Sequence, residues 1–177
     1  GGGILAEPMA RLAADVTAID ATAEAIEAAK AHLAVGQLVI DYRCCTAEEL
    51  AAESDRDKDK FDLIYASEVI EHVTDRQLFA EAIAAMLAPN GTVVITTINR
   101  TLPALAFAKV ALEYVVRLVP AGTHDPKKFV KPAELRAEFG AVGIVFDDLT
   151  GFVPTLAGGF RQSGNLSINY GASGGWE

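Results

Sequence analysis

Short apolar segments alternate with amphipathic helical segments along most of this sequence, and this order limits the possible folds more than any other feature. Apolar, strand-like runs occur at 16–19, 38–44, 61–66, 92–98 and 142–149. Apolar side chains at helical spacing occur at 4–13, 23–34, 75–87 and 133–139. Strands that alternate with helices are typical of a parallel sheet covered by helices. The sequence therefore predicts a doubly wound α/β fold of Rossmann type, closed by an antiparallel hairpin whose partly exposed edge pair includes 165–170.

Helix caps and turn residues support these boundaries. Thr22 can cap the second helix, and Thr46 with Glu49 forms a capping-box pattern that opens a helix over Leu50. The turn-forming residues 89–91 (Pro-Asn-Gly) end the helix at 75–87. Pro132 and Gly140 bracket the last helix. The segment 61–66 is expected to be a buried strand.

Length and charge exclude several classes of protein. A chain of 177 residues accommodates one compact domain, 1–177. Its formal net charge of −9 lacks the basic surface that supplies most affinity for nucleic acid, so no nucleic-acid partner is expected. No uncharged apolar run reaches the length of a membrane-spanning helix.

The residues that follow the strands are the candidates for function, because ligands of such folds bind beyond the carboxyl ends of the strands. The first group is a glycine loop, Gly1 to Gly3, with Asp20 at the end of the next strand. Such glycines allow close approach of a ligand, and an acidic side chain about twenty residues later can accept ribose hydroxyl groups. A tight turn and a helix-capping carboxylate explain the same residues. The absent third glycine argues against a nicotinamide cofactor.

The second group, Ser67, Glu68, Glu71 and His72, lies where the strand at 61–66 meets the next helix. Two carboxylates so close together are stabilised by a shared cation or proton. On a helix, Glu68 would share one face with Glu71 and His72. Two oxygens and one nitrogen suit Mg²⁺ or Zn²⁺ with open positions for substrate. Alternatively, Glu68 bonds to the glycine loop and His72 packs under the sheet.

The third group combines Asn99 and Arg100, after the strand at 92–98, with His124 in a later loop. Either His72 or His124 can accept a proton from a substrate hydroxyl near neutral pH. His124 can equally be an exposed loop residue.

The fourth group is an apolar insertion at about 102–120. Its charges, Lys109, Glu113 and Arg117, line one narrow stripe, and apolar side chains cover the remaining circumference. Such a helix can dock on a bilayer surface or shield an apolar substrate. Burial by the domain or by a second subunit is the alternative.

Several motifs, in this order, resemble one family. They are the glycine loop with Ile-Leu-Ala-Glu, SEVIEHV, PNGTVVITTINRT, EYVVRLVPAGTHDPKKFVKPAEL and NLSINYGA. Together they look like the ubiquinone-biosynthesis O-methyltransferases (UbiG type) of the class I S-adenosylmethionine-dependent methyltransferases. The resemblance covers nearly the whole chain.

The resemblance implies methylation of a catechol-type hydroxyl on a polyprenyl-dihydroxybenzoate or a demethyl-ubiquinol. It assigns Asp20 to the ribose of S-adenosylmethionine and Ser67 to the cofactor pocket, beside Gly1 and Gly3. It assigns Glu68, Glu71 and His72 to Mg²⁺. The insertion would then face a membrane and a polyprenyl tail. Other ubiquinone-biosynthesis proteins are expected partners. The expected location is peripheral, on the matrix side of the mitochondrial inner membrane, and the bacterial cytoplasm or inner-membrane surface is the alternative.

One departure from the family gives an alternative function. The family's fold begins with a helical region and a first strand, which carries the leading glycine of the cofactor loop, and neither precedes Gly1 in this sequence. A catalytically silent methyltransferase fold, acting as a scaffold in a membrane-associated biosynthetic complex, is therefore the second hypothesis.

Overall fold

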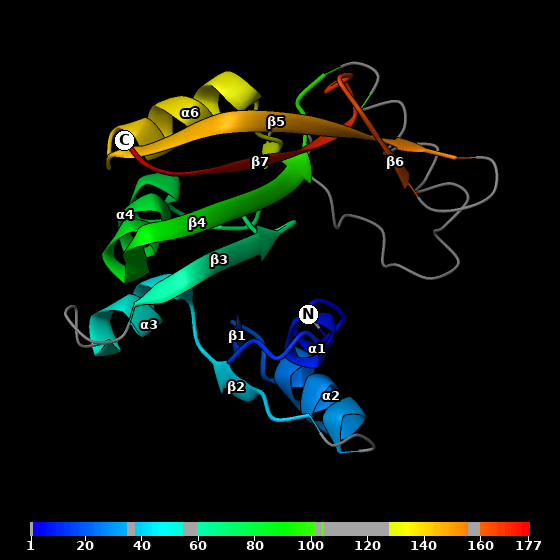
Figure 1. Ribbon diagram of the computed structural model, residues 1–177, viewed down its shortest axis with the longest axis vertical. Coiled ribbons are helices and arrows are strands. Elements are labelled where there is room, and N and C mark those ends of the chain that lie inside the picture. The colour runs from blue at the N-terminus through cyan, green and yellow to red at the C-terminus, as the bar shows by residue number, and fades with distance from the viewer. Residues whose placement is uncertain (1, 35–37, 55–59, 102–103, 105–127, 156–159) are drawn as a thin grey trace. The chain divides into compact units, whose positions relative to one another are not determined.

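The computed structural model describes residues 2–34, 38–54, 60–101, 104, 128–155 and 160–177. These residues form two compact units, Gly1–Ser54 and Asp55–Glu177, and each is described by itself. The expected alternation of helices and strands is confirmed in both units (Figure 1). The organisation as one domain, 1–177, stays a prediction.

The first unit is a small α/β layer. Its elements are α1 (Ala6–Arg11), β1 (Thr17–Asp20), α2 (Ala23–Leu33), β2 (Asp41–Cys44) and α3 (Ala47–Glu53). β1 and β2 pair in parallel, from Thr17 with Asp41 to Asp20 with Cys44. Ile26 and Ala29 of α2 pack with Tyr42 of β2 to form its core. The strand is shorter than the expected 38–44, because pairing with β1 begins at Asp41.

Both expected caps of this unit can be checked. The Thr46 hydroxyl accepts a hydrogen bond from the Glu49 backbone N–H, and the Glu49 carboxylate accepts one from the Thr46 N–H, so the capping box is confirmed. Thr22 does occupy the N-cap position of α2, but its side chain accepts no capping hydrogen bond. The Thr22 hydroxyl donates instead to Oδ1 of Asp20, at 2.7 Å.

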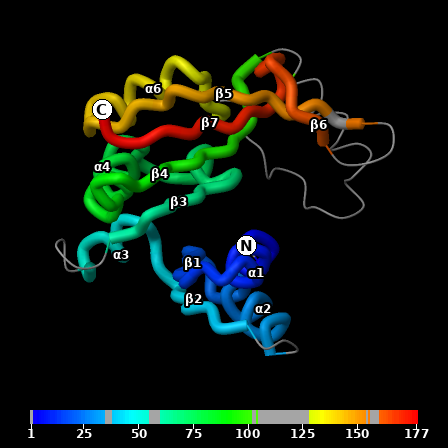
Figure 2. The backbone as a smooth tube through the Cα atoms, in the orientation of Figure 1, coloured from blue at the N-terminus to red at the C-terminus, as the bar shows by residue number. Residues whose placement is uncertain are grey.

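The second unit is a five-stranded mixed sheet with helices packed against it. Its elements are β3 (Phe61–Ser67), α4 (Arg76–Met86), β4 (Leu87–Ile98), α6 (Pro132–Gly140), β5 (Ile144–Pro154), β6 (Phe160–Ser163) and β7 (Asn169–Trp176). The strand order is β3-β4-β7-β5-β6. β3 and β4 are parallel, and every other pair is antiparallel. The tube in Figure 2 shows β4, β7 and β5 running side by side.

One face of this sheet forms the core. Phe79 of α4 contacts Phe139 of α6 edge to face, with ring centroids 6.4 Å apart. Phe139 in turn contacts Phe146 of β5, at 5.1 Å between centroids. Alternate side chains of β4, including Val93 and Ile95, are fully buried, as expected for strand periodicity. Helix α4 begins where predicted, because the Asp75 carboxylate accepts the N–H groups of the first turn.

The last strand is not the edge strand that the sequence predicts. β7 is the central strand of the five, and Tyr170 and Ala172 in it are fully buried. Its glycines permit this position. A Cβ atom at Gly174 would lie 1.9 Å from the backbone oxygen of Val145 on the neighbouring strand. The short β6 is the edge strand at this end of the sheet instead.

β3 also differs from its prediction, because it is largely exposed rather than buried. It lies at the edge of the sheet, with β4 on one side only among the described strands. Leu63 and Tyr65 are 44% and 38% exposed, and Ala66 is the one buried residue of the strand. An apolar composition therefore did not indicate burial on both faces here.

The predicted turn at 89–91 is absorbed into β4. Leu87 pairs with Phe61, whereas Leu63 pairs with Thr92, so residues 88–91 bulge out of the ladder. Gly91 is required there, because a Cβ atom would lie 2.9 Å from the Phe61 carbonyl oxygen. The helix does end before this segment, as expected, and β4 pairs continuously with β3 from Thr92 onwards.

Candidate functional site

The second candidate group lies at the carboxyl end of β3, before α4, as predicted; the segment is a turn, so the shared helix face considered for Glu68, Glu71 and His72 does not form. Glu68 has a backbone φ of +51°, a left-handed conformation that a helix does not contain. Its N–H donates to the Thr96 carbonyl oxygen of β4 at 2.8 Å, and the His72 N–H donates to the Val69 oxygen at 2.8 Å. The Ser67 and Thr96 hydroxyl groups lie 2.8 Å apart. The turn is thus tied to the end of the neighbouring strand.

This turn brings two carboxyl groups together. Glu71 is only 3% exposed, and its Oε2 accepts a hydrogen bond of 2.9 Å from the hydroxyl of buried Thr97. Its Oε1 is buried and has no hydrogen-bond partner in the described structure. Burial of the Glu68 carboxyl, followed by the adjacent charge of Glu71, raises the pKa of Glu68 to about 8. The pair therefore needs a proton or a cation.

The two carboxylates fit a hard divalent cation in part. They supply two oxygens, one of them the unpartnered Oε1 of Glu71, and Mg²⁺ completes its shell with water or substrate oxygens. His72 does not lie under the sheet, since it is exposed. Within the described residues, no cluster of three or more His, Cys, Asp or Glu side chains is positioned to hold a metal ion. The ligand set Glu68, Glu71 and His72 stays a prediction.

The first candidate group lies in the other unit. Oδ1 of Asp20, at the end of β1, accepts hydrogen bonds from the Thr22 N–H and hydroxyl, at 2.9 and 2.7 Å. Gly3 has a φ of +84°, and a Cβ atom there would lie 2.6 Å from the Tyr42 hydroxyl. Gly3 thus meets a steric requirement for glycine beside any role in binding. Gly1 lies outside the described residues.

In the third group, Asn99 and Arg100 make structural contacts, and His124 lies outside the described residues. The Asn99 side chain donates to the Leu166 carbonyl oxygen at 2.7 Å, and Arg100 forms an ion pair with Glu134 of α6. These contacts attach the end of β4 to the loop before β7 and to α6. Nearly all of the insertion at 102–120 lies outside the described residues as well.

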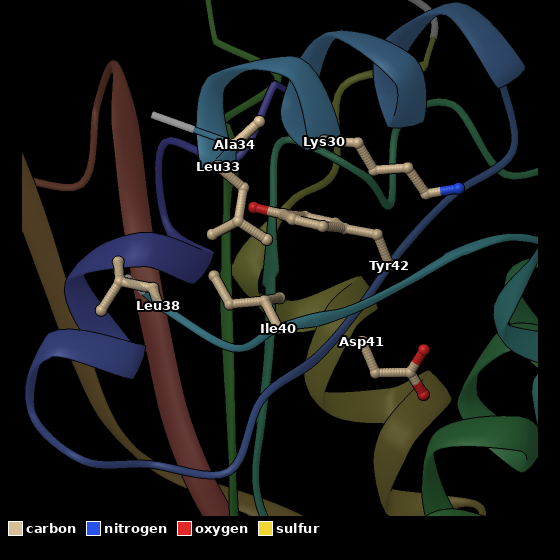
Figure 3. A pocket seen from close by; sticks show the side chains of 7 residues that line it. All are labelled: Lys30, Leu33, Ala34, Leu38, Ile40, Asp41 and Tyr42. Atoms are coloured by element: carbon tan, nitrogen blue, oxygen red, sulfur yellow. The ribbon is translucent and has the colours of Figure 1, made fainter. Parts of the chain in front are cut away.

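A pocket in the first unit contains none of the predicted site residues. It lies between α2 and the segment leading into β2, and Figure 3 shows Leu33, Leu38 and Ile40 around the Tyr42 ring. Lys30 and Asp41 stand at its margins, with their charged ends directed away from this apolar centre (Figure 3).

Comparison with known proteins identifies the family. The methyltransferase domain family matches residues 1–95. The ubiquinone biosynthesis O-methyltransferase of Caulobacter sp. (strain K31) is 45% identical over 96% of this chain and 67% of its own length. That of Chelativorans sp. (strain BNC1) is also 45% identical, over 96% of the chain and 66% of its length. The chain belongs to the ubiquinone biosynthesis O-methyltransferases. It spans about two thirds of the length of these relatives.

Solved structures confirm the fold expected of a class I O-methyltransferase. The match to an S-adenosylmethionine-dependent methyltransferase from Methanosarcina mazei covers 99% of this chain and 88% of the chain of that structure, with a TM-score of 0.71 and 15% sequence identity. The match to the CcbJ methyltransferase from Streptomyces caelestis covers 99% of this chain and 80% of the chain of that structure, with a TM-score of 0.69 and 14% sequence identity. The expected enzyme class, a methyltransferase that uses S-adenosylmethionine, is confirmed by the family.

Two further findings concern the source of the relatives and the length of the helices. The O-methyltransferases reported above come from bacteria. Among the helices that the structure describes, none has the length and apolar character needed to cross a membrane.

Thr96 and Thr97 of this ubiquinone biosynthesis O-methyltransferase are site residues that were not predicted from the sequence. Both lie near the carboxyl end of β4, and their hydroxyl groups bond to Ser67 and to Glu71. The sequence did contain a signal for Thr97. Residues 93, 95 and 97 alternate along an apolar strand and so share its buried face, and Thr97 is the polar residue among them. A buried hydroxyl requires a partner, and the nearby acidic pair can provide one.

Proposed function

We propose that this O-methyltransferase methylates a catechol-type hydroxyl of a polyprenyl-dihydroxybenzoate, a demethyl-ubiquinol or both, with a divalent cation bound at Glu68 and Glu71. The paired carboxyl groups at the end of β3 are the observation that carries the proposal. The relatives are ubiquinone biosynthesis O-methyltransferases, and this supports the substrate class.

The chain's own residues prepare this reaction by charge and position. The two carboxylates balance a divalent charge, and Thr97 holds the plane of one of them. A bound divalent cation would lower the pKa of a neighbouring catechol hydroxyl and orient it. His72, exposed beside the pair, and His124 are the candidates that accept the hydroxyl proton. Much of the rate then comes from holding the nucleophilic oxygen in line with the donor methyl group.

The donor assignments are made for each unit by itself. In the first unit, Asp20 is assigned to the ribose hydroxyl groups of S-adenosylmethionine, with Gly1 and Gly3 as the glycines of the binding loop. In the second unit, Ser67 is assigned to the cofactor pocket. The position of Asp20 and Ser67 at the carboxyl ends of β1 and β3 supports the assignment, because α/β sheets bind ligands at these ends.

The apolar segment 102–120 is assigned to a membrane surface and to the polyprenyl tail of the substrate. Its sequence, with three charges in one stripe, supports docking on lipid. Contacts with other ubiquinone-biosynthesis proteins would follow from work at that surface. The bacterial relatives favour the face of a bacterial inner membrane, and the matrix side of the mitochondrial inner membrane is the alternative.

Methyl transfer to a short-chain dihydroxybenzoate tests the proposal. We expect the purified protein to methylate it with S-adenosylmethionine and Mg²⁺, and to lose most activity with a chelator. The double variant Glu68→Gln with Glu71→Gln should lose at least a hundredfold, whereas Glu81→Gln on α4 should keep full activity. Full activity of the double variant, with or without Mg²⁺, would remove the metal assignment.

Donor binding separates the enzyme from the scaffold hypothesis. Calorimetry with S-adenosylmethionine should give saturable binding that Asp20→Ala weakens. A full-length protein that binds no donor would support a scaffold.

A further inference from the structure

Thr97 occupies a position where an apolar residue would otherwise be expected. It follows Val93 and Ile95 on the buried face of β4, and it is fully buried. On the adjacent central strand its paired residue is Tyr170, which is also fully buried. Valine has nearly the same shape and avoids the desolvation of a hydroxyl group. A hydroxyl at this depth is stabilised only by the hydrogen bond that it makes.

That hydrogen bond has one direction. The Thr97 Oγ1 lies 2.9 Å from Oε2 of Glu71. An ionised carboxylate can only accept, so the hydroxyl donates. The donated hydrogen bond therefore occupies Oε2 of Glu71.

The second oxygen of the same carboxylate has no such partner. Oε1 of Glu71 is buried without a hydrogen bond in the described structure, although the residue is 97% inaccessible. The terminal torsion of a glutamate side chain has no sharp intrinsic preference. The contact with Thr97 therefore holds Oε2 of the carboxylate, and the Glu68 carboxyl, which hydrogen-bonds to the Glu71 side chain, lies beside it as the second carboxyl group of the site.

We propose that Thr97 is a positioning residue for the cation site, which holds Glu71 so that Oε1 is presented to a divalent metal ion. This inference rests on the proposed metal-assisted function, and it adds a residue that does not itself touch the metal, donor or substrate. Residues that orient metal ligands in this way typically change metal affinity about 10- to 100-fold when they are replaced.

Titration calorimetry with Mg²⁺ tests the proposal on the purified protein. We expect Thr97→Val, which keeps the shape and removes the hydroxyl, to weaken Mg²⁺ binding about 10- to 100-fold. Thr97→Ser, which keeps the donor, should restore affinity to within about threefold of the wild type. Affinity for S-adenosylmethionine should stay unchanged in both variants, a result that general unfolding would not give.

A matched control and a second background sharpen the result. Thr150→Val on β5 removes a hydroxyl that bonds to a carboxylate of Asp148 elsewhere in the sheet, and it should leave Mg²⁺ affinity unchanged. In a Glu71→Gln background, Thr97→Val should produce no further loss. If the valine variant does not fold, Thr97→Cys, with a weak donor of similar size, should bind Mg²⁺ more weakly than wild type.

The outcomes separate the two proposals. Equal Mg²⁺ affinity of wild type and of Thr97→Val or Thr97→Cys would overturn the role of Thr97 and leave the metal site standing. Equal losses of Mg²⁺ affinity in Thr97→Val and Thr97→Ser would show that packing, and not the hydroxyl group, is responsible. That result would also overturn the role of Thr97. A wild-type protein that binds no Mg²⁺ would remove the metal assignment and this inference together.

Discussion

Glu68 shows how a single side chain can make the stability of the protein depend on pH. Burial of its carboxyl and the nearby charge of Glu71 raise its pKa to about 8 from an ordinary 4.5. Between these two values the folded protein binds more protons than the unfolded chain, so the free energy of unfolding must fall as pH rises. The contribution of protonated Glu68 to the free energy of unfolding is complete below about pH 4.5, and it is lost as the pH rises through about 8.

Urea unfolding between pH 4.5 and 9, without divalent ions, measures this dependence. We expect Glu68→Gln to flatten the profile and to be more stable than wild type at pH 8.5. Glu81→Gln, on an exposed part of α4, should retain the wild-type slope. Identical slopes in wild type and Glu68→Gln would contradict the prediction.

Gly3 provides a second prediction at the scale of one residue. Its φ of +84° is unfavourable for other residues, and a Cβ atom would approach the Tyr42 hydroxyl to 2.6 Å. We expect Gly3→Ala to lower the free energy of unfolding by about 1–2 kcal/mol or more. Gly2→Ala is the matched control, because a Cβ atom there meets nothing within 4 Å. Equal effects of the two substitutions in denaturant unfolding would be inconsistent with this strain.

At the scale of the elements, the pairing of β7 with β5 depends on the absence of a side chain at Gly174. A Cβ atom at Gly174 would lie 1.9 Å from the Val145 backbone oxygen. Gly174→Ala should therefore destabilise the protein by about 3 kcal/mol, at the upper end of overpacking effects. Gly164→Ala, in open space, should change stability by less than about 0.5 kcal/mol. Thermal unfolding of both variants checks this, and a mild effect at Gly174 would argue against its close packing.

The same strands show what the sequence could and could not predict. The alternation of elements, the capping box at Thr46 and the strand at 92–98 follow from local patterns, and the structure confirms them. The central place of β7 does not follow, because Gly171, Gly174 and Gly175 dilute the apolar signal of a buried strand. Strand order depends on long-range pairing, which residue periodicity does not encode.

The candidate site was predicted in part for a similar reason. Spacing along the chain placed Glu68 near Glu71, but a turn with a left-handed residue brings them together rather than a helix. Thr97 lies 26 positions away from Glu71 in sequence, so its polar side chain at a buried strand position could be noticed, but its contact with Glu71 could not be predicted from local spacing.

At the scale of the whole molecule, the net charge of −9 makes a prediction about lipid. An acidic protein is repelled by anionic vesicles, so attachment through 102–120 must rest on apolar burial. We expect cosedimentation with zwitterionic vesicles that changes little between 50 and 500 mM salt, on the order of twofold. Phe107→Glu with Val110→Glu should abolish it and leave methylation of a short-chain catechol intact. Binding only to anionic vesicles would contradict this mode of docking.

The single tryptophan of the chain gives the second unit an optical reporter of its own. Trp176, at the end of β7, donates its indole N–H to the Ala88 carbonyl oxygen in the bulge of β4, at 2.9 Å. Its fluorescence will therefore follow the melting of the five-stranded sheet, whereas circular dichroism averages over every helix in the protein. Superimposable transitions from the two signals would mean that both halves unfold cooperatively, and separated ones would give each half its own melting temperature.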